Sequence, residues 1–391
     1  MARRKVLIAR SVVYAILTSL PDGNPARKPS ILLRTCRLFR LFWLTFRLLR
    51  PDLFRALRRV WEIKEEDYKA SFGAENTDDD HDDHDTHSAR NKRRRARKTD
   101  VLRAMGDMGY SGSTFFRTSD SAYLVKSIPR RFEHDFFKNE LLLPYAEHMQ
   151  ENPASLLVRI TDLLEKAHKS IGVFLGLAPS HHIVMENILY GQDHGSEEGP
   201  KRKWESWDLK PMSFFYPERD VAGGALATEA TKSKLADEFN DKIKLTRAHA
   251  TQFQEILKKD TQFLAKMNAV DYSLFLVRIS AADASDSAPM PPSESGQDTN
   301  EPMPPAQPPF SPPNPPTWRT GFPSSDGKEV YRAAILDFFW AKHTLHAKIM
   351  TGLVRGYNLI DEQGPMSITA ESEEYRGRFL EMCAGFVEIE E

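Results

Sequence analysis

Cysteine is scarce in this chain, and long uninterrupted apolar runs are missing from it. Its 391 residues include only two cysteines, Cys36 and Cys383. Two thiols cannot build a disulfide framework and their spacing suits no metal site, so we expect a reducing, intracellular environment. Because no run reaches about eighteen uncharged apolar residues, the sequence predicts no membrane-spanning helix. The N-terminal stretch is basic and then apolar, but Arg10 interrupts it and no small-residue cleavage site follows, so we expect no signal peptide.

The chain also lacks a net charge of either sign. It has 54 Lys and Arg against 55 Asp and Glu, so its overall charge gives no reason to expect a nucleic-acid partner. The charge is unevenly spread, however, because residues 30–61 carry eight arginines and one acid, Asp52. This stretch either lies on an anionic membrane or packs its arginine stems on its own domain, and the sequence leaves both open. Pro51 is expected to separate two helices within it.

Composition divides the remainder into folded blocks and inserts. Residues 74–99 change from acidic to basic with almost no apolar side chains, which predicts a disordered insert. Its "NKRRRARK" run leaves nuclear localisation or a contact with anionic lipid open, although such a run is more often simply solvated. Residues 281–327 hold thirteen of the 25 prolines and predict a second disordered insert within one domain. The predicted organisation is an N-terminal helical entry (1–29), a basic helical part (30–73), the first insert (74–99), the core (100–280), the second insert (281–327) and the remainder of the domain (328–391).

Two aspartates adjoin the apolar runs on either side of the proline-rich insert. The runs 273–279 and 330–336 are each typical of a buried strand. If they pair antiparallel, Asp271 before the first run and Asp337 after the second lie at the same end of one hairpin. Two carboxylates so placed can divide the work of phosphoryl transfer, one orienting the attacking hydroxyl and the other holding magnesium. On spacing alone, both are equally well explained as hairpin-end aspartates.

A lysine on an apolar strand face marks a second candidate site. The segment "MGYSGSTFFRTSDSAYLVKSI" predicts a small-residue turn at 111–114, a strand, a Ser-Asp-Ser turn and a second strand. Lys126 shares a face of the second strand with Leu124 and Ile128, and a buried ammonium needs an anion nearby. Backbone N–H groups of the turn, beside this lysine, are suited to nucleotide phosphates. The alternative is a structural ion pair, and Glu140 is an available partner in either case.

Two more strands and a helix are predicted between these sites. "HHIVMENILYG" is an apolar strand that either leads through Asn187 into a linker or is an ordinary buried strand. "KWESWDLKPM" alternates so that Asp208 and Lys210 share one face, where Lys210 either reaches a phosphate or pairs with Asp208. Apolar residues at helical spacing over 253–267 predict an amphipathic helix before Asp271. Helix, aspartate, strand, strand, aspartate is the order found in the C-terminal lobe of a kinase.

Together these motifs resemble the phosphatidylinositol phosphate kinase family. Its MDYSL motif is matched by "VDYSL" at 270–274 and its I-I-D motif by "ILD" at 335–337. Its GKSGS loop and I-I-K strand are matched by "GYSGS" at 109–113 and "LVK" at 124–126. The V-V-M-x-N strand and the Y-D-L-K-G-S motif correspond to "IVMEN" and "WDLKP", and the tail "MSITAESEEYRGRFLEM" is similar to the family's closing segment. The similarity covers nearly the whole chain, with the two inserts as additions.

The resemblance implies an α+β fold of two lobes, with antiparallel sheets and flanking helices, distantly related to protein kinases. It implies ATP and Mg²⁺ in a cleft between the lobes, Asp337 as the metal-binding aspartate, and Asp271 as the catalytic aspartate together with Lys210 and Asp208. The acceptor would be an inositol hydroxyl of a phosphoinositide headgroup, which implies a cytoplasmic protein peripheral to an anionic membrane surface. A homodimer stays open. Residues implied around the nucleotide are Ser111, Gly112, Ser113, Lys126, Met185 and Asn187.

The chain also departs from the family's pattern. Pro211 and Met212 replace the glycine and serine after D-L-K, and "LADEF" at 235–239 lacks the lysine of the K-D-x-x-F motif. We therefore expect a lipid kinase similar to the phosphatidylinositol-4-phosphate 5-kinases but with a degenerate substrate loop. The alternative is a non-catalytic relative that binds phosphoinositides or proteins, and retention of the lysine and both aspartates argues against it. The substrate loop, rich in lysine in the family, here offers Lys342, His343, His346, Lys348 and Arg355.

Overall fold

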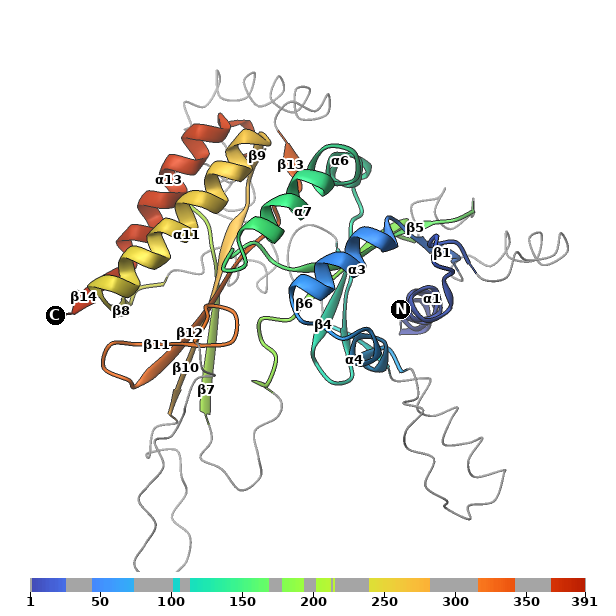
Figure 1. The fold of residues 1–391 in the computed structure, drawn as a ribbon, viewed down its shortest axis with the longest axis horizontal. Helices are drawn as coiled ribbons and strands as arrows, with labels where there is room; N and C mark the ends of the chain where they lie inside the picture. The colour runs from blue at the N-terminus through green and yellow to red at the C-terminus, as the bar shows by residue number, and fades with distance from the viewer. Residues whose placement is uncertain are drawn as a thin grey trace, which may run out of the picture.

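Two main β-sheets with helices packed around them give the chain an α+β architecture (Figure 1). The computed structural model describes residues 2–25, 44–73, 101–105, 113–168, 178–192, 202–211, 214, 239–281, 316–341 and 367–390. The first expected insert and most of the second lie outside these residues. Within the described part, no helix is both long enough and apolar enough to cross a membrane.

The N-terminal sheet has six strands, and every neighbouring pair in it is antiparallel. The predicted Ser-Asp-Ser turn lies between its β3 and β4, and the predicted strand in "HHIVMENILYG" is its β6. Both predictions are therefore confirmed. In spatial order the strands are β1 (Phe46–Leu48), β5 (Ile160–Lys166), β6 (His181–Glu186), β4 (Tyr123–Ser127), β3 (Phe115–Thr118) and β2 (Leu102–Ala104).

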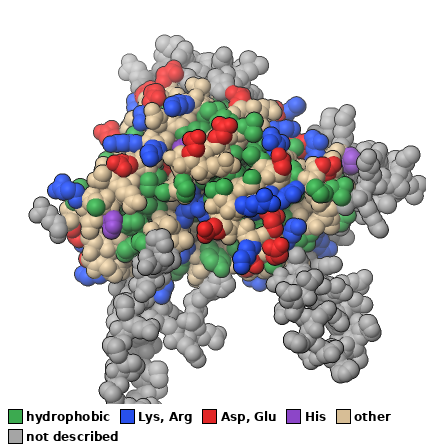
Figure 2. Space-filling model, in the orientation of Figure 1, with side chains coloured by type: hydrophobic (Ala, Val, Ile, Leu, Met, Phe, Trp, Pro, Cys, Tyr) green, Lys and Arg blue, Asp and Glu red, His purple; other side chains and the backbone are tan. Residues whose placement is uncertain are grey.

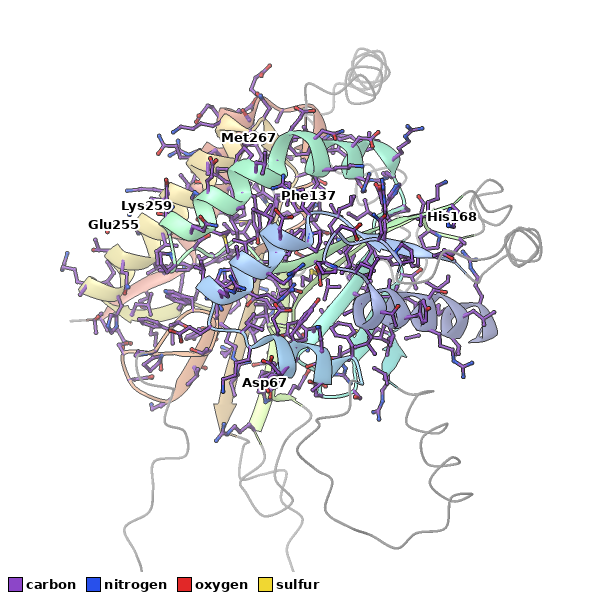
Figure 3. The ribbon with its side chains drawn as sticks, turned by 45° about the vertical axis from the view of Figure 1, so that its right-hand side comes forward. Asp67, Phe137, His168, Glu255, Lys259 and Met267 are labelled. Carbon is purple, nitrogen blue, oxygen red and sulfur yellow. The ribbon has the colours of Figure 1, made fainter. Side chains whose placement is uncertain are left out.

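Helices lie against this sheet and enclose its apolar side chains. Helix α1 contacts β1 and β2, while α3 contacts β5 and α7. Val12 of α1 packs in one core cluster with Phe46 of β1, and Phe137, the first residue of the π-helical turn before α7, is fully buried (Figure 3). The helices are α1 (Ala2–Thr18), α3 (Pro51–Val60), α4 (Glu65–Ser71), α6 (Arg131–Phe136), the π-helical turn η1 (Phe137–Leu141) and α7 (Leu142–Glu151).

The C-terminal sheet contains the hairpin that the two apolar runs predicted. Strands β10 and β12 pair antiparallel, with Ser273 opposite Leu336 and Ile279 opposite Val330. This register is the predicted one, and it brings the start of one run to the end of the other. The predicted strand of "KWESWDL" is confirmed as β7 and pairs with β10. The spatial order is β11 (Phe322–Pro323), β12 (Glu329–Leu336), β10 (Ser273–Ala281) and β7 (Arg202–Leu209).

The predicted helix before Asp271 is confirmed as α11 (Arg247–Lys266), which packs along α13 (Ser372–Gly385). The hydroxyl of Thr246 caps it by accepting the backbone N–H of His249. Glu255 and Lys259 lie on its outward side, and Met267 follows its C-terminal end (Figure 3). Two short ladders hold the ends of this helix pair: antiparallel β9 (Ala269–Val270) with β13 (Trp340–Ala341), and parallel β8 (Ile243–Thr246) with β14 (Val387–Glu390).

The basic N-terminal block differs from its predicted helical character. Pro51 does start a helix, as expected, because proline is suited to the first turn where its missing N–H is not needed. Just before it, however, residues 46–48 form strand β1 and pair with β5. Phe46 is 1% exposed, and pairing with β5 satisfies the backbone hydrogen bonds of this stretch at the edge of the sheet. The helix expected on this side of Pro51 is therefore wrong over these residues.

The end of the second insert, predicted at residue 327, lies too far along the chain. Residues 316–327 are described and folded, and Trp318 is 4% exposed with its ring stacked on Phe322. Arg319 is buried beside Glu186, with which it forms an ion pair. A large aromatic and a paired arginine make the last part of this proline-rich stretch a packed segment, and only 282–315 lies outside the described residues.

Candidate functional site

The two aspartates singled out in the sequence flank the hairpin in an unusual backbone conformation. Asp271 has φ 64° and Asp337 has φ 62°, both in the left-handed region. Aspartate enters this region more readily than most residues, yet a non-glycine residue there still costs on the order of 1 kcal/mol or more. Both residues turn the chain sharply at the same end of the β10–β12 hairpin. Such strain at two carboxylates is typical of a functional site.

Lys126 of β4 reaches across from the N-terminal sheet to Asp337. Its side chain is 8% exposed, and its Nζ forms an ion pair and hydrogen bond with Asp337 Oδ1. The sequence predicted that this buried ammonium needs an anion, and the anion is Asp337. Glu140, the other partner considered, lies on the exposed side of η1. The contact joins two residues 211 positions apart and links the two sheets at one point.

Asp271 is held by two donors from different parts of the chain. Lys210, just after β7, lies 3.0 Å from Asp271 Oδ2 through its Nζ. Ser367 donates its hydroxyl to Asp271 Oδ1 at 2.7 Å. Pairing with a carboxylate, expected to be Asp208, was one of the two sequence alternatives for Lys210, and in the structure its Nζ forms an ion pair with Asp271. Each oxygen of Asp271 therefore has one donor in place.

Electrostatics connect these groups into one site. Burial opposes ionisation of Asp337, but the charge and hydrogen bond of Lys126 outweigh it, so the pKa of Asp337 lies below its ordinary value. Burial raises the pKa of Asp208, against the opposing charge of Lys210. The negative charge of Asp337 raises the pKa of Asp208 further, and the positive charge of Lys126 lowers it. The lysines and aspartates predicted from separate motifs therefore act on one another across a single region.

The donor set suits a magnesium ion that arrives with a nucleotide. Mg²⁺ is usually bound by one or two carboxylates together with phosphate oxygens and water. Asp337 supplies an ionised carboxylate whose side chain is 43% exposed, and Asp208 lies near enough to be affected by the charge of Asp337, although burial favours the protonated form of Asp208. Among the described residues, no group of three or more His, Cys, Asp or Glu side chains could hold a metal alone. The arrangement fits a site completed by phosphates.

The residues implied around ATP fall into three groups. Ser113 and Met185 are described and buried, Met185 in β6 opposite Leu124 of β4. The side chain of Asn187 donates to Ser121 O at 2.7 Å and accepts the backbone N–H of Leu189, so it holds the turn after β6. The remaining predicted residues lie outside the described part of the chain: Ser111, Gly112, Lys342, His343, His346 and Lys348.

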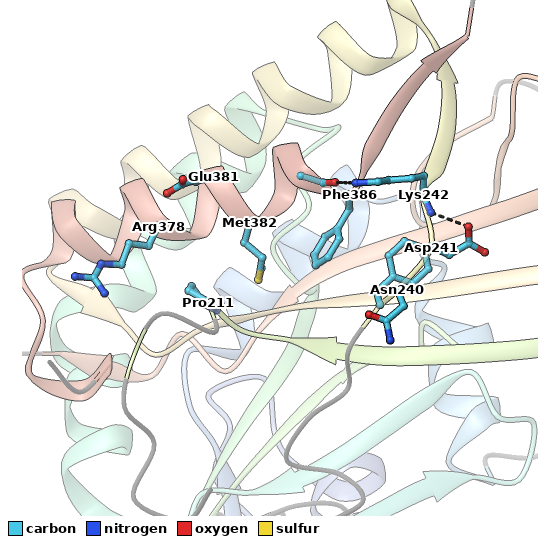
Figure 4. Close-up of a pocket in the computed structure, with 10 residues that line it drawn as sticks. Pro211, Asn240, Asp241, Lys242, Arg378, Glu381, Met382 and Phe386 are labelled. Atoms are coloured by element: carbon cyan, nitrogen blue, oxygen red, sulfur yellow. Dashed lines mark hydrogen bonds between the residues drawn. The ribbon is translucent and has the colours of Figure 1, made fainter. Parts of the chain in front are cut away.

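A shallow pocket lies beside the site without including it. Pro211, Lys242, Arg378 and Phe386 are among the residues that line it, where the end of α13 approaches the end of β7 (Figure 4). None of the described site residues lines this pocket. The face of the molecule in Figure 2 shows Lys and Arg interspersed with Asp and Glu, so its described residues form no large patch of one sign. Neither the pocket nor this surface therefore provides a stronger candidate for a functional site than the two aspartates.

Ser367 is the site residue that the sequence argument missed. The tail was matched to the family as a segment, but a serine with no distinctive neighbours gives no sign that it contacts a residue 96 positions earlier. Only the fold reveals the contact. The strand pair β9–β13 was likewise too short to be predicted from two-residue runs.

The sequence is similar to known proteins over the region that contains these residues. The family described as phosphatidylinositol-4-phosphate 5-kinase matches residues 96–386. A phosphatidylinositol 4-phosphate 5-kinase of Plasmodium falciparum is 25% identical over 57% of this chain and 12% of its own length. A probable phosphatidylinositol phosphate kinase of Dictyostelium discoideum is 28% identical over 45% of this chain and 22% of its own length. A mouse phosphatidylinositol 4-phosphate 5-kinase-like protein 1 is 25% identical over 57% of this chain and 46% of its own length.

These alignments span less than half of the length of each relative named. The family match, in contrast, covers most of this chain and contains both aspartates, Lys126, Lys210 and Ser367. The chain therefore belongs to the phosphatidylinositol-4-phosphate 5-kinase family.

Proposed function

We propose that this protein transfers the γ-phosphoryl group of ATP to an inositol hydroxyl of a phosphatidylinositol phosphate. The observation that carries the proposal is the contact of Lys126 with Asp337 at the end of the hairpin that also bears Asp271. A buried ammonium, a strained open carboxylate and a second carboxylate are the parts that phosphoryl transfer uses. Membership of the family favours a phosphoinositide as the acceptor class.

In this proposal, Asp271 orients the inositol hydroxyl and takes its proton as the oxygen attacks the γ-phosphorus. A new O–P bond forms, the bond from the γ-phosphorus to the bridging oxygen of ATP breaks, and ADP leaves. Lys126 exchanges its bond to Asp337 for nucleotide phosphate oxygens. Asp337, with Asp208 beside it, would hold Mg²⁺, which supplies charge neutralisation on the phosphates when bound. Catalysis then rests on positioning and on fixed charges.

The proposed place of action is the cytoplasmic surface of an anionic membrane, where such a lipid lies. Two of the described arginines in the basic block pair with acids of their own domain, whereas Arg50 and Arg59 are exposed. Arg47 pairs with Glu165, and Arg58 is buried against Glu65 and Asp162. They support the alternative in which the block packs on its own domain. Contact with the membrane would then fall to other surfaces, the substrate segment included.

The test is a transfer assay with labelled ATP and vesicles that contain, in turn, each monophosphorylated phosphatidylinositol. We expect magnesium-dependent labelling of one lipid by the wild type and its loss in Asp271→Asn. Asp52→Asn, an exposed aspartate on α3, is the matched control and should retain activity. Magnesium-dependent ATP binding without transfer to any lipid would overturn the proposal and favour the non-catalytic alternative.

A further inference from the structure

The described residues on either side of 342–366 both contact residues 269–271, the turn that bears Asp271. On the N-terminal side, β13 pairs with β9, so Trp340 lies opposite Val270 and Ala341 opposite Ala269. On the C-terminal side, Ser367 donates to Asp271, the residue that follows β9. Two separate anchors therefore converge on residues 269–271. This convergence suggests that the residue at the second anchor has a role beyond packing.

The bond between Ser367 and Asp271 is well placed to fix a carboxylate. Ser367 is 3% exposed, and its hydroxyl oxygen lies 2.7 Å from Asp271 Oδ1. Lys210 Nζ lies 3.0 Å from the other oxygen, while the side chain of Asp271 remains 26% exposed. A single donor leaves a carboxylate free to rotate about χ2, because that torsion has a broad energy profile. Two donors on opposite oxygens define one orientation and leave the remaining lone pairs for an incoming hydroxyl.

We propose that Ser367 is a positioning residue for Asp271, holding its carboxylate in the orientation that accepts the proton of the lipid hydroxyl. The proposal rests on the function proposed above. Hydrogen bonds to an ionised acceptor are stronger than neutral ones, and loss of correct orientation lowers the rate even where binding is unchanged. Ser367 thus acts through Asp271, without touching ATP or lipid itself.

A matched control lies in the same tail. Ser372, five positions further on, donates its hydroxyl to Ala265 O at 3.1 Å, at the C-terminal end of α11. Ser372→Ala removes the same atom as Ser367→Ala and also loses one hydrogen bond to the α11 region. It leaves both donors of Asp271 in place. A difference between the two variants therefore reports on the carboxylate and not on the general loss of a tail contact.

The experiment measures kcat and KM for ATP and lipid in wild type, Ser367→Ala, Ser367→Thr and Ser372→Ala. We expect kcat to fall about tenfold in Ser367→Ala with KM for ATP within roughly twofold, as the loss of one charge-assisted hydrogen bond predicts. Ser367→Thr keeps the hydroxyl and should restore most of the rate. Ser372→Ala should match the wild type. Equal kcat in Ser367→Ala and wild type would overturn the proposal.

Two further measurements keep the test decisive. Ser367→Cys fills the same space with a much weaker donor, so it should fold normally and still lose most of the rate. The ¹³C carboxylate resonance of Asp271, assigned by its loss in Asp271→Asn, should move in Ser367→Ala but not in Ser372→Ala. An unmoved resonance would refute the bond even if the wild type phosphorylates no lipid. Absence of lipid phosphorylation with a moved resonance would instead reject the proposed function alone.

Discussion

Two ion pairs, one inside the N-terminal part and one between the sheets, differ in how far the acidic partner is exposed to solvent. Arg58 and Asp162 are both enclosed, with side chains 5% and 1% exposed and 3.3 Å between Nη1 and Oδ2. Lys126 is similarly enclosed at 8%, but its partner Asp337 is 43% exposed and lies in a strained conformation. The first pair is closed on both sides. The second leaves its anion open, which is what a ligand-binding carboxylate requires.

The neighbours of the two pairs make the same distinction. Asp162 accepts a hydrogen bond from Tyr68, and Arg58 also binds Glu65 and the backbone of residue 161, with its guanidinium 4.4 Å from the Tyr68 ring centre. These groups all belong to the N-terminal part and tie α3 and α4 to β5. The Lys126–Asp337 contact joins the two sheets and has room for another partner. We therefore expect the first pair to govern stability and the second to govern ligand binding.

The largest expected effect comes from Asp337→Asn. This change removes the open carboxylate, so Mg-ATP should no longer raise the melting temperature, and the transfer rate should fall about a thousandfold or more, equivalent to several kcal/mol in the barrier. The free protein should also melt at a lower temperature, because the nearly enclosed Lys126 ammonium loses its anion, so the Mg-ATP shift is measured from each variant's own melting temperature. The measurement is a thermal shift with and without Mg-ATP, beside the transfer assay. A preserved Mg-ATP shift in the variant would show that the metal-binding carboxylate lies elsewhere.

Asp162→Asn should have the opposite profile. Removing one charge of an enclosed pair leaves Arg58 partly uncompensated, and such losses typically cost about 3–5 kcal/mol of unfolding free energy. Glu65 still binds Arg58, so we expect the lower end of that range. Urea unfolding measures the loss, and Mg-ATP should still raise the melting temperature of the folded variant. A variant as stable as the wild type would show that the Arg58–Asp162 pair does not stabilise the fold.

The strands and the hairpin register could be predicted because their apolar runs are long and nearly uninterrupted. Runs of seven residues on either side of one insert have few other ways to bury themselves, so Asp271 and Asp337 could be placed at one end. The partner of Lys126 could not be obtained from spacing, because Asp337 lies 211 positions away. Local reasoning offered Glu140 instead. Before the fold was known, only the family resemblance placed Lys126 and Asp337 in the same site.

Other features could not be predicted from the sequence, because they are too short or depend on the rest of the fold. Strand β1 has three residues inside an arginine-rich stretch, where a short edge strand gives no period to detect, and its backbone conformation is set by pairing with β5. Residues 316–327 share the proline content of the insert, so composition alone could not separate their packed Trp318 from the sequence before it. The bond from Ser367 to Asp271 depends on where the tail returns, which no local pattern encodes.

Acid should weaken the enclosed N-terminal core before it affects the open site. His182 is fully buried, and burial lowers its pKa to about 3, while that of its neighbour His181 is lowered to about 4. The unfolded chain binds these protons near pH 6.5, so stability falls as pH drops below 6.5, by about 1.4 kcal/mol per pH unit for each histidine. Asp337, whose pKa is lowered, stays ionised over this range.

The measurement is urea unfolding of wild type and His182→Leu between pH 7.5 and 5. Both ring nitrogens of His182 lack a hydrogen-bond partner among the described residues, so an apolar replacement should fold and should have a flatter pH dependence. His168→Leu, an exposed position, serves as the control (Figure 3). An unchanged slope in His182→Leu would mean that the acid sensitivity arises elsewhere in the chain.

The smallest effects should come from arginines at the edge of the enclosed part. Arg50 and Asp52 are 3.4 Å apart with side chains 49% and 68% exposed, so Arg50→Gln should cost less than about 0.5 kcal/mol. Arg47 binds Glu165, whose side chain is 9% exposed, so Arg47→Gln should cost more, on the order of 1 kcal/mol. Because Glu165 already neutralises Arg47 and Asp52 lies beside Arg50, neither arginine should contribute much to attraction by anionic lipid. Sedimentation with anionic vesicles at low and high salt should therefore give the same binding for wild type and the double variant. Salt-sensitive binding that disappears in the double variant, with folding intact, would restore the membrane role of this block.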